Sequence, residues 1–502
     1  MDWLRKVYNS KIEYARAFFA FVILIYIVIA CNSSGYYHWD EHYQIIEFAN
    51  YKLGHAKLDD LAWEYKAHIR PSFQPVLCLS IFKLFISIGI ADPYRLALIL
   101  RITSALFSIF VIKKFINSNK LLVKEKNWIY YIFLSYFLWF IPYINVRFSS
   151  ESWSGLVFLL VLTSINTITI KNRRRPFILI GILMGISILF RYQSALLVIG
   201  AICWMYFIGK FRFQEIALTA CSTLLVLVLG AFMDWWFYGE LTFTLLNYFN
   251  VNLIQGVASN YGTSPWYEII FYILKSPGLF GILIFMSFLQ LTIFKSRCLI
   301  LWSIVPFLIV HSIIPHKELR FLFPIINIAP LLLILGYQEI RNNSFSTKKI
   351  LFPLALTFLF LYNLAGLIAT GTKGAGSGKI TVAQYIHNHY AGRKVNLIFT
   401  EGLNPYTDWE YPKNTFYKPD GDLKTISSVW QPDFQNLKQD RKVNLLLLSK
   451  DDIIGPRTIE LLQRLKYVQV YQSIPAITQK INYFYDKSLN RSSFILYELR
   501  DQ

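Results

Sequence analysis

Cysteine and acidic residues are scarce in this sequence. Its 502 residues include 5 Cys, and 30 Asp and Glu stand against 50 Lys and Arg. The cysteines lie in or beside apolar segments and show neither a disulfide framework nor the spacing of a zinc site. Outside short loops there is also no basic stripe with interleaved aromatic residues. These absences argue against a disulfide-rich scaffold, a zinc domain and a nucleic-acid partner, despite a net charge of +20.

Long apolar runs, in contrast, are abundant. Hydrophobic residues make up 55% of the chain, and the mean hydropathy is +0.41. A helix that crosses a bilayer needs about 20 apolar residues, and apolar runs recur along residues 1–370. The predicted fold class is therefore a polytopic α-helical membrane protein. About 11 transmembrane helices are predicted, near residues 17–32, 96–112, 127–146, 151–170, 177–192, 194–209, 215–236, 278–294, 298–314, 321–338 and 350–369.

Basic clusters between these segments predict the topology, because loops rich in Lys and Arg stay in the cytoplasm. The clusters lie at 113–126, 171–175, 210–212, 295–297 and 341–349. The predicted helices alternate without conflict if residues 76–90 form a juxtamembrane helix on the outer side. We therefore expect a cytoplasmic N-terminus, an outer C-terminus, a first outer loop at 33–95 and a second large outer loop at 237–277.

The composition changes after residue 370, where a glycine-rich stretch, Gly371 to Gly378, predicts a hinge. This stretch lacks the pattern of a phosphate-binding loop. Alternating apolar segments beyond it predict strands at 395–400, 443–448, 468–471 and 494–497, with helices at 381–389 and 458–466. We expect two domains: a membrane domain at 1–370 and a small extracytoplasmic α/β domain at 371–502.

The first outer loop begins with an unusual group of polar residues. His38, Asp40, Glu41 and His42 lie within five positions, directly after an apolar run. Carboxylates at a membrane boundary need a reason. They belong either to an aromatic interfacial belt whose charges face water or to a catalytic loop. A metal site at His38, Asp40 and His42 has a feasible spacing, but no set of three ligands is evident.

A second polar group lies between the apolar runs at 298–314 and 321–338. His316, Lys317, Glu318 and Arg320 follow Pro315 closely. This segment is either a solvated turn or a site for an anion, because Lys and Arg supply the charged donors that phosphate oxygens prefer. A cationic turn and the Asp40 carboxylate make a coherent chemical pair. The cations would stabilise a departing lipid phosphate while the carboxylate takes the proton of an acceptor hydroxyl.

Other candidate residues lie on the same predicted outer side. Each also has a structural interpretation: Arg191 as an arginine that extends to the interface, Asp234 as an interfacial helix end, and Tyr261 and Trp266 as turn residues. Arg147 and Glu151 are interpreted as a local pair on one helix. The full set of candidate binding residues is His38, Arg70, Arg191, Asp234, Tyr261, Trp266, His316, Lys317, Glu318 and Arg320, with Asp40 and Glu41 as catalytic candidates.

These motifs resemble, in order, those of the glycosyltransferase family 22 mannosyltransferases of GT-C fold, which include GPI-anchor and lipid-linked-oligosaccharide enzymes. His38-Trp-Asp-Glu41 resembles the family's His-Pro-Asp-Glu, and Tyr261-Gly-Thr-Ser-Pro-Trp266 its Tyr-Gly-x-His-Pro-Trp. The stretch from Asp234 to Val251 is similar to its Asp…Phe-Tyr-Gly…Asn…Asn-Val. The most specific match is His316-Lys-Glu-Leu-Arg-Phe-Leu-Phe-Pro324. Trp39, Ser264 and Leu319 depart from the family pattern, which puts donor and acceptor selectivity in question.

The resemblance implies an inverting glycosyltransferase with a polyprenyl- or dolichyl-phosphate-linked mannose donor and a glycan or glycolipid acceptor. It implies no metal or other cofactor, with Asp40 as general base, Glu41 as a substrate-binding neighbour, and His316, Lys317 and Arg320 at the donor phosphate. The alternatives are a GT-C transferase for another lipid-linked sugar, and a polytopic transporter or flippase. We expect contact with membrane lipids, and a location in a bacterial inner membrane, or in the ER membrane if the host is eukaryotic.

Overall fold

The computed structural model describes residues 2–168, 174–342, 351–376, 378–407, 412–419, 421–431, 434, 443–453, 456–485 and 493–500. The chain divides into two compact units. Unit 1 consists of residues 1–27, 64–77 and 102–363, and unit 2 consists of residues 28–63, 78–101 and 364–502. Unit 2 therefore combines the end of the chain with two segments from the predicted first outer loop and its flanks.

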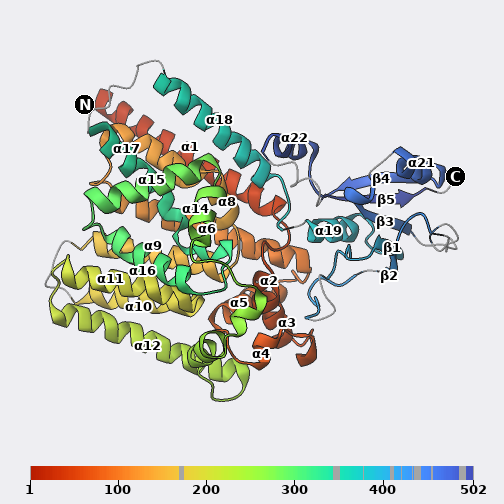
Figure 1. The fold of residues 1–502 in the computed structure, drawn as a ribbon, viewed down its shortest axis with the longest axis horizontal. Coiled ribbons are helices and arrows are strands. Elements are labelled where there is room, and N and C mark those ends of the chain that lie inside the picture. The colour runs from red at the N-terminus through yellow and green to blue at the C-terminus, as the bar shows by residue number, and fades with distance from the viewer. Residues whose placement is uncertain are drawn as a thin grey trace. The chain divides into compact units, whose positions relative to one another are not determined.

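Each of the eleven apolar segments predicted from the sequence contains helix (Figure 1). The longer helices of residues 1–371 are α1 (Asp2–Asn32), α5 (Phe73–Ser87), α6 (Pro93–Ser118), α7 (Trp128–Phe137), α9 (Ser150–Asn166), α10 (Arg175–Phe190), α11 (Ala195–Phe207), α12 (Phe213–Tyr238), α15 (Leu279–Phe294), α16 (Leu299–Ile313), α17 (Ala329–Asn342) and α18 (Leu351–Gly371). The shorter helices are α2 (Trp39–Glu41), α3 (Glu47–Lys52), α4 (Trp63–Lys66), α8 (Phe140–Asn145), α13 (Thr244–Phe249) and α14 (Glu268–Lys275).

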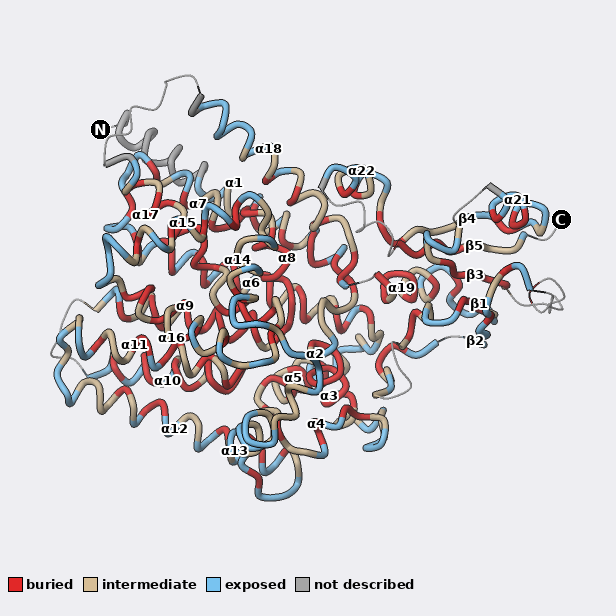
Figure 2. The backbone as a smooth tube through the Cα atoms, in the orientation of Figure 1, coloured by how far each residue is buried: buried red, intermediate tan, exposed pale blue. Residues whose placement is uncertain are grey.

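Several of these helices have the length and composition of membrane spans. Among the described residues, five are long and apolar enough, and a sixth span results if α15 and α16, which are bent by 117°, count as one. Many residues of α12 and α18 are exposed (Figure 2). Large apolar residues are among them, as expected for surfaces that face lipid. The fold is therefore that of a polytopic helical membrane protein, and the number of eleven spans stays a prediction.

One predicted span, 127–146, is broken into α7 and α8 at Leu138. Pro142 explains the break, because a proline ring clashes with the carbonyl group four residues earlier and donates no hydrogen bond. Asn363 of α18 satisfies the freed backbone groups. Its amide donates to the Phe137 carbonyl at 2.7 Å and accepts from the Trp139 N–H at 2.9 Å. A polar side chain thus replaces the missing helical bonds, as membrane depth requires.

Glycine brings α9 against the 3₁₀ segment η7 (Leu319–Ile328). A Cβ atom on Gly155 would lie 2.4 Å from the carbonyl oxygen of Pro324, so only glycine permits this distance. Gly155 lies four residues after Glu151, and Pro324 lies four residues after Arg320. The close approach at Gly155 and Pro324 therefore carries two charged residues of the site toward each other.

Unit 2 contains a five-stranded sheet in the order β2-β1-β3-β5-β4. β1 is parallel to β2 and β3, whereas β5 is antiparallel to β3 and β4. The strands are β1 (Val395–Thr400), β2 (Gly421–Ile426), β3 (Val443–Ser449), β4 (Tyr467–Gln472) and β5 (Phe494–Leu499). The sequence predicted four of them. It missed β2, an edge strand on which only Ile426 is buried, so no apolar pattern marks it.

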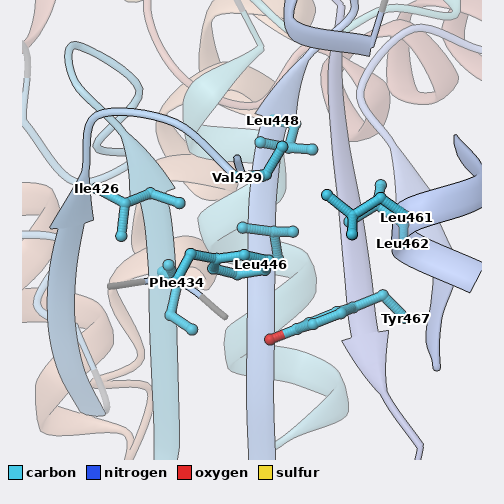
Figure 3. Close-up of a cluster of buried hydrophobic side chains, with 9 residues drawn as sticks. Ile426, Val429, Phe434, Leu446, Leu448, Leu461, Leu462 and Tyr467 are labelled. Carbon is cyan, nitrogen blue, oxygen red and sulfur yellow. The ribbon is translucent and has the colours of Figure 1, made fainter. Parts of the chain in front are cut away.

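One face of the sheet is covered by apolar side chains. Leu446 and Leu448 of β3 and Tyr467 of β4 pack with Leu461 and Leu462 of α21 (Pro456–Arg464) (Figure 3). Helix α19 (Lys379–His389) precedes β1, and α22 (Ala476–Tyr485) lies between β4 and β5 in the sequence. The strand and helix alternation expected after residue 371 is therefore present among the described residues.

Candidate functional site

The turn between α16 and η7 is fastened to the loop that carries Tyr261 and Trp266. Lys317, only 5% exposed, donates from Nζ to the carbonyl oxygens of Ile314 at 2.6 Å and Ser264 at 2.9 Å. Ser264 donates its N–H to the Pro315 carbonyl, and His316 Nδ1 lies 2.9 Å from the Gly262 carbonyl oxygen. Two motifs more than fifty residues apart are thus brought together, with Lys317 between them.

The environment of Lys317 changes its acidity. Burial lowers the pKa of the Lys317 ammonium, and the nearby Glu268 carboxylate partly opposes that effect. Tyr261 and Trp266, in contrast, are 61% and 65% exposed. The loop therefore exposes two aromatic side chains, and Lys317 binds the loop backbone at the Ser264 carbonyl oxygen.

From His316, charges of alternating sign continue into the core of unit 1. His316 Nε2 lies 2.8 Å from one Glu318 oxygen, and Arg320 Nε lies 2.5 Å from the other. Arg320 Nη1 also lies 3.0 Å from Glu151 Oε1, and Arg191 Nη1 lies 3.0 Å from that same oxygen. We call His316, Glu318, Arg320, Glu151 and Arg191 the charge cluster.

Arg191 is held on several sides. Arg191 is 7% exposed. Its Nε donates to Gln193 Oε1 at 2.5 Å, and its Nη1 donates to Ser150 Oγ at 3.2 Å. The guanidinium groups of Arg191 and Arg320 each lie 5.6 Å from the ring centre of Phe321. A guanidinium buried with these partners does not extend to solvent, and a binding role for Arg191 stays a prediction.

Glu151 is the residue that the sequence reasoning missed. Its interpretation as a local partner of Arg147 does not account for its contacts with Arg191 and Arg320, which are 40 and 169 positions away. Its side chain is 3% exposed, and a charge buried that deeply requires opposite charges nearby. A carboxylate in the first turn of a long apolar helix is the signal that could have drawn attention to it.

Asp234 makes a second polar group in unit 1. Its Oδ1 accepts from the N–H and hydroxyl of Ser72 at 2.7 and 2.6 Å, and its Oδ2 accepts from Thr244 Oγ1 at 2.5 Å. Tyr238 donates to the Arg70 carbonyl at 2.7 Å. Asp234 and Arg70, predicted as binding residues, thus lie in a network that connects the end of α12 to the residues preceding α5.

Asp40 lies in unit 2, in the first turn of α2. His38 precedes that helix, and its Nδ1 accepts the Asp40 N–H at 3.3 Å and lies 3.5 Å from Asp40 Oδ1. Glu41 is 8% exposed, and its Oε2 accepts the Tyr37 N–H at 3.2 Å. The Asp40 side chain is 14% exposed, so it is only partly accessible, and Glu41 is buried.

Metal ligation has no support from geometry in the described part of the chain. No group of three or more His, Cys, Asp or Glu side chains there is arranged to hold a metal ion. His42, one member of the metal alternative, instead contacts Glu47 at 3.0 Å. Metal independence of the reaction stays a prediction.

Comparison with known proteins gives the family. The sequence model of the Alg9-like mannosyltransferase family matches residues 18–399. The chain belongs to this family. Membership confirms the predicted resemblance and the prediction of a glycosyltransferase at the level of the family. The matched residues include the charge cluster and Asp40.

Several curated proteins are similar to this chain. GPI mannosyltransferase 3 of Candida albicans is 28% identical over 61% of this chain and 61% of its own length. GPI mannosyltransferase 3 of Debaryomyces hansenii is 25% identical over 76% of this chain and 70% of its own length. The human GPI alpha-1,2-mannosyltransferase 3 is 23% identical over 66% of this chain and 58% of its own length. The aligned region therefore spans less than two thirds of the length of the Candida albicans and human proteins.

A solved structure supports the fold. ArnT from Cupriavidus metallidurans, in a crystal structure with undecaprenyl phosphate, aligns with a TM-score of 0.53 over 98% of both chains at 12% identity. At this identity the likeness concerns the fold alone. It supports the predicted GT-C architecture of a polytopic membrane glycosyltransferase.

Proposed function

We propose that this protein is an inverting glycosyltransferase that moves mannose from a polyprenyl- or dolichyl-phosphate-linked donor to a hydroxyl of a glycan or glycolipid. The observation that carries the proposal is the charge cluster, in which two buried guanidinium groups share the Glu151 carboxylate. The names of the relatives support mannose and a GPI-type glycolipid. The undecaprenyl phosphate bound to ArnT supports a lipid-phosphate donor.

Within the cluster, Arg191 and Arg320 contribute two positive charges against the two carboxylates Glu151 and Glu318. Once Glu318 is displaced, the two guanidinium groups and Glu151 leave a charge of +1 for the departing lipid phosphate. Donors fixed in advance around a developing negative charge stabilise it at little reorganisation cost. Arg320 and His316 are the groups that we propose to contact the phosphate.

The two carboxylates of the cluster have different roles in this proposal. The Glu151 side chain is 3% exposed and that of Glu318 is 23% exposed. Glu151 therefore fixes the orientation of Arg191 and Arg320 permanently. Glu318 occupies the more accessible side of Arg320, and we propose that the donor phosphate displaces it from Arg320 and His316. Lys317 acts mainly by holding the Ser264 loop against the turn.

Asp40 is the proposed general base, which takes the proton of the acceptor hydroxyl as it attacks the anomeric carbon. Inversion follows from a single displacement of the lipid phosphate. Glu41 is the proposed substrate-binding neighbour, and no metal takes part. The fold that we propose has eleven spans, with Asp40 and the region 371–502 on the periplasmic or luminal side. A bacterial inner membrane is favoured over the ER.

Reconstitution with a panel of donors tests this function. Purified protein in vesicles would receive polyprenyl phosphates that carry mannose, glucose or aminoarabinose, together with a glycolipid acceptor. The proposal expects product only with mannose, with inverted anomeric configuration by NMR. Product with another sugar would assign a different GT-C transferase. Movement of substrate into the vesicles without any product would assign a transporter.

A further inference from the structure

The helix that follows Asp40 contains a π-turn, η1 (His42–Ile46), between α2 and α3. At this turn the Glu47 N–H bonds to the His42 carbonyl, five residues earlier. In an α-helix, residues five apart point about 140° away from each other, since each residue turns the chain by about 100°. The π-turn instead places the His42 and Glu47 side chains together, 3.0 Å apart. Such turns are frequent at functional sites.

Glu47 uses this orientation to bind a distant part of unit 2. Its carboxylate accepts the backbone N–H groups of Thr415 at 2.8 Å and Phe416 at 2.9 Å, and the Thr415 hydroxyl as well. Asn50 donates to that hydroxyl oxygen at 2.9 Å. The Glu47 side chain is 1% exposed. A buried carboxylate with this many donors makes strong, charge-assisted bonds across 368 positions of sequence.

Aromatic rings strengthen the same connection. The His42 ring lies between Tyr36, at 5.1 Å and 23°, and Tyr417, at 5.3 Å and 13°. Phe416 stacks on Phe82 at 5.3 Å and 7°. His42 is completely buried, and the ring stack and the contact of its Nε2 with Glu47 hold it in place. We call His42, Glu47, Thr415, Phe416 and Tyr417 the latch.

Asp40 lies two residues before the latch. Its own helix, α2, has only three residues, and one helical turn is not stable alone. The backbone position of Asp40 is therefore set by what holds the turns on either side. On the preceding side, the Ser34 carbonyl accepts the Ala375 N–H at 2.8 Å. Both sides of the Asp40 turn are thus held by residues beyond 370.

We propose that His42, Glu47 and Thr415 are positioning residues that fix the Asp40 carboxylate, so that the segment at 412–419 is an integral part of the catalytic loop. This inference rests on the proposed role of Asp40 as base. It assigns a function to the end of the chain, which would otherwise be an accessory sheet. Misplacement of a reacting group by about 1 Å costs on the order of 100-fold in rate.

A matched pair of threonine variants tests the latch. Thr415→Val removes the hydroxyl that donates to Glu47, and Thr400→Val removes one that donates to Asp452 at 3.1 Å, also in unit 2. Asp452 likewise accepts the N–H and hydroxyl of Ser449, so both variants remove one of several bonds to a carboxylate. We expect Thr415→Val to lower kcat roughly 10–100-fold with the donor KM unchanged, and Thr400→Val to keep the wild-type kcat.

The assay is run below the melting temperature of both variants, so that folded protein is compared. Wild-type kcat in Thr415→Val would overturn the inference. Two further variants, Asp40→Asn and the double variant Asp40→Asn with Thr415→Val, distinguish a failure of the latch inference from a failure of the proposed function. If the latch acts through Asp40, the double variant is no slower than Asp40→Asn. A further loss in the double variant would overturn the inference, whereas an active Asp40→Asn would overturn the role of Asp40 itself.

Discussion

In unit 1, Arg320 lies between two carboxylates, and in unit 2, Asp40 lies in one helical turn with backbone and imidazole neighbours. The charge cluster joins residues up to 169 positions apart, and its interior partners are almost completely buried. Asp40 contacts His38, two positions away, and its side chain stays partly accessible. A fixed cationic site suits a large anion that must be bound and released. An accessible carboxylate suits transfer of a proton.

Asp40→Asn should produce the largest effect, because it removes the proton acceptor while keeping the shape of the side chain. We expect kcat to fall by about 10²–10⁴-fold, the usual contribution of a general base. The donor KM should hardly change. Steady-state kinetics with mannosyl polyprenyl phosphate measures both. A rate equal to that of the wild type would show that Asp40 is not the general base.

Glu151→Gln should affect stability more than any other change in the charge cluster. It leaves Arg191 and Arg320 buried with one shared partner less, and breaking a buried ion pair costs about 3–5 kcal/mol. Thermal unfolding in detergent would show a lower midpoint. Glu318→Gln is the control, since the Glu318 side chain is 23% exposed. Equal midpoints for the two variants would contradict the assignment of Glu151 as the permanent partner.

Gly155→Ala tests how the cluster is assembled. The new Cβ would lie 2.4 Å from the Pro324 carbonyl oxygen, so α9 and η7 must separate. Overpacking of this kind costs about 1–3 kcal/mol, and we expect weaker donor binding because Glu151 and Arg320 move apart. Gly54→Ala adds no crowding, since no atom lies within 4 Å of its added Cβ, but its φ of +83° strains any side chain, so this variant measures the cost of backbone strain alone. Unchanged donor affinity in Gly155→Ala would contradict the inference that the close approach of α9 and η7 assembles the charge cluster.

Chelation should have the smallest effect. If Arg320, Arg191 and His316 neutralise the phosphate, EDTA should leave the transfer rate as it was. Loss of activity with EDTA, and its recovery with Mg²⁺ or Mn²⁺, would show that the charge cluster does not neutralise the phosphate without a metal ion. The same assay with added salt would report how far the cluster is screened.

The two regions also differ in what the sequence alone predicts. The Asp40 turn was found from the sequence because His38, Asp40, Glu41 and His42 are neighbours in the chain. The charge cluster was found only in part. His316, Glu318 and Arg320 stand together in the sequence, whereas Glu151 gains its role from a close helix approach at Gly155. No local pattern reports such an approach.

The latch was missed for a related reason. Glu47 and His42 are five positions apart, a spacing that an α-helix would keep on different faces, and only a π-turn brings them together. Apolar patterns located the eleven long apolar segments and four of the five strands, because buried residues of helices and strands recur with a regular spacing. They did not locate the shorter helices α13, α14 and α22. They gave no sign of the break at Leu138 or of the exposed strand β2.

Binding of polyprenyl phosphate, the product of the proposed donor, tests the central division of roles most directly. Titration of wild type, Asp40→Asn and Arg320→Lys with a fluorescent polyprenyl phosphate gives three dissociation constants. Arg320→Lys loses paired, charge-assisted bonds worth about 1.5–3 kcal/mol, so we predict binding weaker by roughly 10–100-fold, with wild-type affinity in Asp40→Asn. Weaker binding in Asp40→Asn together with unchanged binding in Arg320→Lys would contradict the account.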